Sequence, residues 1–312
     1  MAEVVWVDAE GMAFDNSVPQ KVGRLLDAAG AAVGLEQGVR VTLKVNTAEE
    51  GYPYGLRPVF YRPAVALAES VSGKRVTLCD GLKLVDYWNG AKGQSFLEVA
   101  RASGYATDTL GGNFAINGGY SGDEGDLFSV GLAASELGGV EVGTAVCRAD
   151  TLWFLSHVTL HPLFGLSGAL WNGGFECLVG RERTRVLAGV DPYPFNGVRP
   201  DRATLGGLWG RALEAHRAVR FAVSERVLYV NYLWDVTPQP EYFPFSAGPV
   251  VRNLGFLASR DPLALDAATW GVLEAERPGA VRQVTQIEFA EVLGEAEALG
   301  LGARGHTLRR LS

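Results

Sequence analysis

Cysteine is scarce in this chain of 312 residues, which has only three cysteines, Cys79, Cys147 and Cys177. An odd number of widely separated cysteines predicts no disulfide framework, and without a Cys-x-x-Cys pair no self-contained zinc or iron–sulfur motif is present. A four-cysteine iron–sulfur cluster cannot be built from three cysteines of one chain. Reduced thiols, as in a cytoplasmic protein, are expected.

An excess of positive charge is also missing, because the formal net charge is -7. A chain of this charge lacks the basic surface that nucleic acids and anionic membranes attract. No basic segment followed by a long apolar stretch opens the sequence, and no apolar run approaches the roughly 18 residues of a membrane span. We therefore expect a soluble cytoplasmic protein whose partner is a small molecule, and the sequence leaves a homo-oligomer open.

Short apolar runs alternate with amphipathic segments along the chain. Residues 39–45 and 227–233 are rich in β-branched side chains and predict strands, whereas 19–29 and 208–223 have helical spacing. This alternation predicts an α/β fold, a mostly parallel or mixed sheet flanked by helices, and we expect one domain over residues 1–312. Ligands of such sheets bind at the carboxyl ends of the strands. Three residues at predicted strand ends are therefore ligand-binding candidates: Lys44, Asn46 and Asp80.

Several glycine-rich segments predict secondary structure less clearly. Residues 111–125 contain neither Gly-x-Gly-x-x-Gly nor a P-loop pattern and predict a surface loop. Residues 140–147 predict a strand, 165–171 predict the start of a helix, and 180–201 predict a long connection.

Asp261-Pro262 predicts the start of a helix, because the aspartate can cap the first amides and proline suits the first turn.

Residues 156–177, SHVTLHPLFGLSGALWNGGFEC, are the predicted functional centre. They hold two of the four histidines, His157 and His161, beside a predicted strand end. Histidine can act as an acid, a base or a metal ligand, and the small residues that follow predict exposed backbone amides that would bind a carboxylate or phosphate. A base beside an anion-binding turn suits proton transfer next to a carboxylate, and we expect His161 to be the base, with His157 or Asp235 assisting. The predicted ligand contacts in this segment are Gly165, Ser167, Gly168 and Asn172.

Other interpretations of the same residues stay open. Both histidines can be buried hydrogen-bonding residues, or they can bind a metal together with Asp80, Asp235 and Cys177. Cys177 can be a nucleophile, but a buried small apolar residue is the simpler interpretation. The remaining histidines, His216 and His306, are expected to be solvated.

Five segments together resemble the family of domain of unknown function 362. They are Lys44-Val45-Asn46, residues 95–105, the segment 156–177, DVTPQPEYFPFSAGPVV (235–251) and LASRDPLALDAATW (257–270). The resemblance covers roughly residues 38–300 and implies an α/β scaffold, but the family has no single established activity.

The segment 156–177 is also similar to the HxxxGxSGGxK segment of nickel-dependent lactate racemases. In those enzymes a histidine transfers protons and a lysine holds a pincer cofactor covalently. The resemblance implies that His161 is the base, and that Gly165, Ser167 and Gly168 form an anion-binding turn.

This chain departs from those relatives at two places. Trp171 stands where they have the lysine, so a covalent nickel-pincer cofactor is not expected. Some members of the family have Cys-x-Cys where this chain has Pro240 and Tyr242, so an iron–sulfur cluster is not expected either.

The leading hypothesis is therefore an enzyme of the isomerase, racemase or lyase type that acts on a small anionic carboxylate or carbonyl compound. The alternatives are a metal-binding protein or metalloenzyme that uses His157 and His161, a redox protein, and a ligand-binding protein without catalysis.

Overall fold

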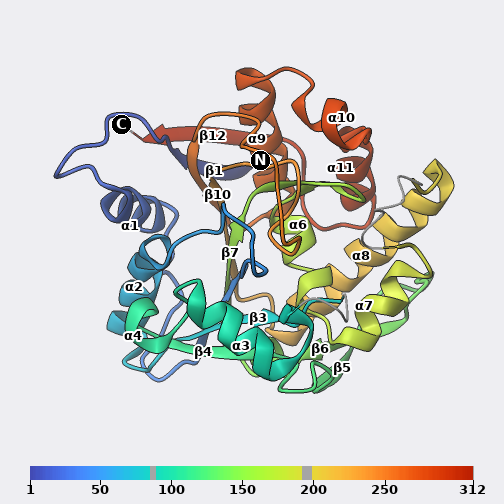
Figure 1. Ribbon diagram of the computed structural model, residues 1–312, viewed down its shortest axis with the longest axis horizontal. Coiled ribbons are helices and arrows are strands. Elements are labelled where there is room, and N and C mark those ends of the chain that lie inside the picture. Colours follow the sequence, from blue (N-terminus) through green and yellow to red (C-terminus); the bar gives the residue numbers. More distant parts are fainter. Residues whose placement is uncertain (85–88, 192–198, 312) are drawn as a thin grey trace.

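The computed structural model describes residues 1–84, 89–191 and 199–311, which are built around an eight-stranded sheet (Figure 1). The order across the sheet is β12-β1-β11-β10-β7-β2-β3-β4. Adjacent strands are parallel, except that β11 is antiparallel to both of its neighbours. The predicted α/β class with a mixed, mostly parallel sheet is confirmed. The strands are β1 (Ala2–Val7), β2 (Val41–Val45), β3 (Thr77–Gly81), β4 (Asn113–Asn117), β7 (Thr151–His157), β10 (Val227–Leu233), β11 (Gly255–Ser259) and β12 (His306–Leu311).

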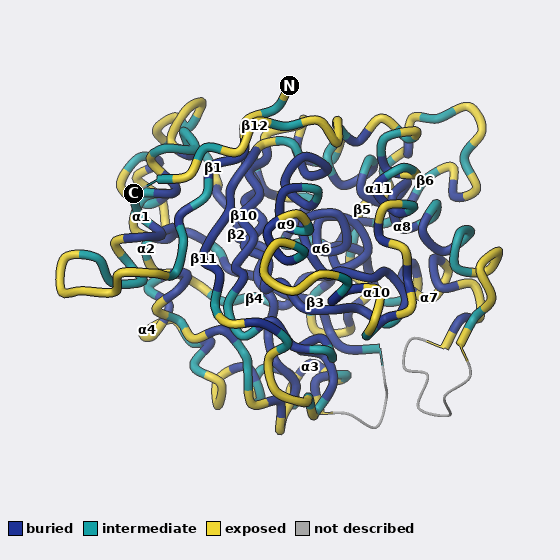
Figure 2. The backbone as a smooth tube through the Cα atoms, turned by 90° about the horizontal axis from the view of Figure 1, so that it is seen from above, coloured by how far each residue is buried: buried dark blue, intermediate teal, exposed yellow. Residues whose placement is uncertain are grey.

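Helices cover both faces of the sheet, and this explains why its central strands are apolar on both sides. Along β7, Trp153 and Leu155 pack against the face that α1 and α2 cover, while Leu152 and Phe154 belong to the core under α8, α9 and α11. Figure 2 shows these strands as buried tubes inside a more exposed shell. The helices are α1 (Val18–Ala28), α2 (Arg62–Ser72), α3 (Gly93–Ala102), α4 (Thr107–Leu110), α5 (Thr144–Cys147), α6 (Ala169–Asn172), α7 (Gly180–Leu187), α8 (Arg202–Ala222), α9 (Pro262–Glu276), α10 (Ala280–Thr285) and α11 (Phe289–Ala298).

The predicted start of α9 is confirmed in detail. The Asp261 carboxylate accepts a hydrogen bond from the amide of Ala264 at 2.9 Å, and Pro262 occupies the first helical position. The second carboxylate oxygen accepts from the amide of Ala303 at 3.1 Å. Asp261 therefore caps the helix and also fixes the chain that leads into β12.

The glycine-rich segments fold only partly as predicted. Residues 111–125 contain the edge strand β4, 140–147 divide into β6 (Gly139–Gly143) and α5, and 180–201 contain α7. Residues 165–171 begin as β9 (Gly165–Ser167), which pairs with β8 (Thr159–His161), and α6 follows. The strand predicted over 140–147 and the helix start predicted over 165–171 are therefore confirmed in part, with shorter bounds. The loop over 111–125 and the connection over 180–201 were wrong in that each contains a regular element, because contacts with distant segments decide short glycine-rich stretches. The hairpin strand β5 (Gly125–Ser129) pairs with β6 in the same way.

The helices in the part of the chain that the structure describes are too short or too polar for a lipid bilayer. A membrane span needs about 20 predominantly apolar residues. Within the described ranges, no helix has both the length and the hydropathy for such a span.

Candidate functional site

The carboxyl ends of β2, β3 and β7 lie side by side, and they bring several predicted residues together. Asn46, which follows β2, accepts a hydrogen bond from the His157 amide at 3.0 Å. Its side-chain amide donates to Asn172 at 2.8 Å. Asn46 therefore joins two strands to the short helix α6, and its side-chain amide is used by the protein itself.

A buried cluster of charges lies next to these strand ends. The Lys44 ammonium is 2.7 Å from one Asp80 oxygen, and the Lys83 ammonium is 3.2 Å from the other. Thr47 donates to Asp80 through its amide and its hydroxyl, at 2.9 and 2.7 Å. Burial alone would raise the pKa of Asp80, but the two ammonium groups outweigh it and hold that pKa well below its usual range. Asp80 is therefore an ionised structural partner of both lysines.

His161 is buried between two aromatic rings. Its ring centroid lies 4.2 Å from that of Trp171 and 5.7 Å from that of Tyr242. Nδ1 accepts the amide of Leu163 at 3.2 Å, and Nε2 is 2.6 Å from the Tyr242 hydroxyl. Burial lowers the pKa of His161 to about 3, so the imidazole is neutral at physiological pH. Because Nδ1 accepts, Nε2 carries the proton and donates to Tyr242.

A small cavity of about 20 Å³ opens beside this imidazole. That volume holds about one water molecule. Apolar side chains form much of its wall, and three charged side chains join them. The lining residues are Lys83, Leu84, His161, Leu163, Trp171, Phe175, Glu176, Arg183, Leu187 and Tyr242.

Arg183 and Glu176 form the charged side of the cavity. The Arg183 guanidinium lies 3.8 Å from the Glu176 carboxylate and donates to the carbonyl of Leu82 at 2.6 Å. Its buried Nε has no hydrogen-bond partner among the described residues. The Trp171 indole donates to Glu176 at 3.2 Å. The cavity therefore combines two cations with one carboxylate that is already partly engaged.

His157 and Asp235 do not join this cavity. The His157 Nε2 donates to the carbonyl of Trp234 at 2.8 Å, and burial lowers the pKa of this imidazole to about 4. Its Nδ1 is buried without a partner in the described part of the chain. Asp235 is half-buried and faces Arg57 at 4.0 Å, and burial raises its pKa while Arg57 lowers it. The three predicted catalytic residues therefore occupy two separate places.

A carboxylate of the protein occupies the amides that follow the predicted anion-binding turn. Asp266 of α9 accepts the amides of Ala169 and Leu170 at 2.8 and 2.9 Å, and the Asn231 side chain at 2.8 Å. A Cβ atom at Gly168 would lie 2.3 Å from an Asp266 oxygen, so this glycine allows the carboxylate to approach.

The neighbouring residues of that turn are also used by the fold. Gly165 has φ +86° and packs against Phe289, Ile287 and Val281, and Ser167 accepts a weak bond from Asn172 at 3.4 Å. That Gly165, Ser167 and Gly168 hold an external anion stays a prediction, while the amides of Ala169 and Leu170 that follow them are occupied by a carboxylate of the protein.

The two remaining histidines differ in their exposure to solvent. His216 is fully buried, with ring nitrogens 3.0 Å from the carbonyl of Leu170 and 2.8 Å from the Tyr229 hydroxyl, so the expectation of a solvated residue was wrong. His306 is partly exposed on β12.

Among the residues that the structure describes, no three His, Cys, Asp or Glu side chains form a group that could hold a metal. The alternative ligand set of His157, His161, Asp80, Asp235 and Cys177 is not assembled. Cys177 is buried, and burial raises the pKa of its thiol far above the usual range, which disfavours a nucleophilic thiolate. The residues near His161 do not fit a pincer cofactor either, because an indole at position 171 has no amine for the covalent bond.

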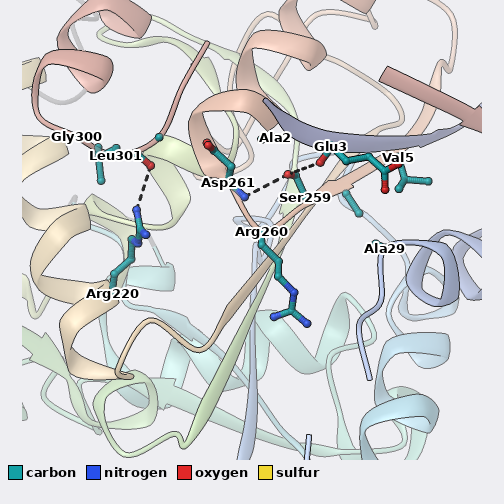
Figure 3. A pocket seen from close by; sticks show the side chains of 12 residues that line it. Ala2, Glu3, Val5, Ala29, Arg220, Ser259, Arg260, Asp261, Gly300 and Leu301 are labelled. Carbon is teal, nitrogen blue, oxygen red and sulfur yellow. Dashed lines mark hydrogen bonds between the residues drawn. The ribbon is translucent and has the colours of Figure 1, made fainter. Parts of the chain in front are cut away.

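A wider groove of about 450 Å³ lies at the opposite end of the sheet, beside the amino end of β10 (Figure 3). Three of its polar side chains already donate to backbone carbonyls of the protein, in the pairs Arg220–Leu301 (3.0 Å), Ser259–Glu3 (2.8 Å) and Arg260–Gly30 (2.9 Å). This groove is larger than the cavity beside His161, but its polar side chains are engaged by the fold, whereas the small cavity is lined by an imidazole, a phenol and three charged side chains.

Sequence reasoning missed much of the cavity wall. Lys83 and Arg183 belong to no recognisable motif, and Glu176 lies inside the segment 156–177 but was not singled out as a site residue. One signal was the family resemblance, which singled out Trp171 and, with Pro240, Tyr242 as departures of this sequence. The structure places these two departures on either side of His161.

The family described as domain of unknown function (DUF362) matches residues 41–271. No curated protein matches this chain. Among solved structures, a structural-genomics target from Thermotoga maritima is 13% identical with a TM-score of 0.44, and the match covers 89% of this chain and 61% of that one. The lactate racemase apoprotein from Thermoanaerobacterium thermosaccharolyticum is 12% identical with a TM-score of 0.39, covering 74% and 50%. The chain thus spans less than two thirds of the length of either protein.

Replacing Asp80 by Asn should lower the free energy of unfolding by about 3–5 kcal/mol, because two buried ammonium groups lose their carboxylate. Lys44→Met should cost less, since Lys83 and Thr47 still bind Asp80. Urea denaturation measures both, with Asp150→Asn at the exposed Arg40 pair as control, expected to cost less than about 1 kcal/mol. The contribution of Asp80 should be present at neutral pH and lost as the pH falls, because its folded pKa is depressed. Equal losses for Asp80→Asn and Asp150→Asn would contradict this account.

Replacing Asp266 by Ala should cost about 3 kcal/mol or more, because two buried amides and the Asn231 side chain lose their acceptor. The matched control is Asp201→Ala, which removes the exposed cap of α8 that accepts from the Thr204 amide at 2.8 Å and should cost about 1 kcal/mol. If both variants unfold at the same urea concentration, Asp266 does not have the structural role described here.

Proposed function

This chain belongs to the family of domain of unknown function 362, and we propose that it is an enzyme that transfers a proton on a small anionic carbonyl or carboxylate compound. The observation that carries this proposal is the 2.6 Å contact between His161 and Tyr242 at the wall of a cavity that also holds Lys83 and Arg183. An isomerase, racemase or lyase reaction fits this combination of a proton donor and two cations.

The hydrogen-bond network determines how the histidine takes part. Because the Leu163 amide occupies Nδ1, the imidazole donates from Nε2 to the Tyr242 oxygen. A neutral histidine that donates in this way stabilises negative charge on its acceptor, so Tyr242 can in turn donate its own proton to a developing oxyanion. In this proposal His161 acts on the acid side of the reaction through Tyr242, and not as the base expected from the sequence. The Glu176 carboxylate in the wall of the same cavity accepts the carbon-bound proton of the substrate.

Lys83 and Arg183 would attract the negative charge of the substrate. Lys83 is held by Asp80 at 3.2 Å and Arg183 by the carbonyl of Leu82 at 2.6 Å, so both are positioned before a ligand arrives. Preorganised cations attract a carboxylate without a reorganisation cost at the moment of reaction. The cavity of about 20 Å³ accommodates little more than one polar group, which favours a small substrate.

Ligand binding without catalysis is the second candidate. The observation in its favour is that Trp171 and Tyr242 fill the space on both sides of His161 at the positions where relatives carry cofactor ligands. A chain without the lysine and the Cys-x-Cys of those relatives could keep the anion site and lose the reaction.

Solvent exchange tests the catalytic proposal without knowledge of the full reaction. The protein is incubated in D₂O with lactate, malate, pyruvate or acetoacetate, and proton NMR follows the loss of the carbon-bound proton next to the carboxylate or carbonyl group. The wild type should catalyse exchange on at least one compound, and Tyr242→Phe and His161→Asn should slow it by about 100-fold or more. His306→Gln changes a distant histidine on β12 and should keep the full rate.

Circular dichroism and thermal unfolding show whether the variants are folded. Wild-type exchange rates in both folded variants would contradict the proposed role of the His161–Tyr242 pair. Saturable binding of a compound that never exchanges its proton would favour the ligand-binding candidate.

A further inference from the structure

Glu241 is a buried acid that the proposed reaction does not use. It lies between Pro240 and Tyr242, and its carbonyl accepts the amide of Glu49 at 2.8 Å, which fixes the backbone. The residue is 3% exposed, and its Oε2 has no hydrogen-bond partner among the described residues. A buried carboxylate oxygen without a partner is costly, so this position favours the protonated acid.

Two charged groups of the cavity wall also act on Glu241. Lys83 attracts its negative charge, whereas Glu176 and Asp80 repel it, and Lys83 and Glu176 both line the cavity. Burial is the largest effect and raises the pKa of Glu241 to about 7. Uncharged phenols complete its electrostatic surroundings: Tyr52, Tyr61 and Tyr105.

We propose that Glu241 takes up a proton when the cavity takes up an anion, so that the site binds a monocarboxylate together with one proton. The inference rests on the assignment of this cavity as the substrate site. An anion beside Lys83 competes for the attraction that stabilises ionised Glu241 and adds a new repulsion. One proton from solvent then binds the Glu241 carboxylate as one negative charge enters, and the net charge of the buried region is unchanged.

This linkage defines both a substrate class and a role for the residue. A single proton compensates one added charge, so a monocarboxylate fits the site better than a dicarboxylate. Glu241 is a positioning residue that acts through the field at Lys83, because it is not among the residues that line the cavity. Reciprocity requires that a higher pH, which ionises Glu241, weakens anion binding.

The test uses sodium formate, the smallest carboxylate, titrated into the full-length protein by calorimetry between pH 6 and 8.5. Wild-type Kd should rise above about pH 7 and approach a tenfold increase for each further pH unit, as for one linked proton. Glu241→Gln mimics the protonated acid, so its Kd should stay constant across this range. Paired titrations in two buffers of different ionisation enthalpy should detect proton uptake above about pH 7 in the wild type and none in the variant.

Glu49→Gln is the matched control. Glu49 is also buried, but its carboxylate accepts the amides of Glu50 and Gly90 at 2.8 and 2.9 Å, so its loss should leave the pH dependence of formate binding in place.

The inference is overturned if formate does not bind the wild type, if wild-type Kd ignores pH, or if Glu241→Gln keeps the wild-type pH dependence. Proton exchange on a substrate without this linkage would retain the proposed function and reject the inference. Proton-linked formate binding in a protein that never exchanges substrate protons would support the inference and reject the enzyme proposal.

Discussion

Two buried ammonium groups share one carboxylate in this protein, and the arrangement of the site depends on that sharing. Asp80 lies 2.7 Å from Lys44 and 3.2 Å from Lys83. Charges removed from water are tolerated only when they are paired and hydrogen-bonded, and Thr47 supplies two of those hydrogen bonds. The pairing holds Lys83 at the cavity wall, and Lys83 in turn attracts the charge of Glu241.

A second buried carboxylate organises the segment that looked most like a ligand site. Backbone amides at a helix start attract any anion, and the sequence pattern cannot tell whether that anion is external or internal. Here Asp266 reaches these amides from α9, a helix about 100 residues later in the chain. The amides that follow Gly168 therefore bind a carboxylate that belongs to the fold, and the cations of the candidate site lie elsewhere.

The departures from related sequences become meaningful once their positions in space are known. Trp171 and Tyr242 are separated by about 70 residues, yet their rings lie 4.2 and 5.7 Å from the same imidazole. Two changes that remove cofactor ligands thus meet at one histidine, where an indole packs and a phenol forms a hydrogen bond. The structure places both positions against His161.

The sequence by itself determined the α/β class, the strands β2 and β10, the helices α1 and α8, the Asp261 cap of α9 and the family, because these depend on local periodicity and on contiguous motifs. It also singled out Lys44, Asn46 and Asp80 as ligand-binding candidates and His161 as a base, and the structure buries all four. Only the tertiary structure decided which groups face each other: Lys83, Arg183, Glu176, Glu241 and Tyr242 meet near one cavity, while His157 and Asp235 lie apart. Side-chain pairing across distant segments depends on packing, and no local pattern in the chain encodes it.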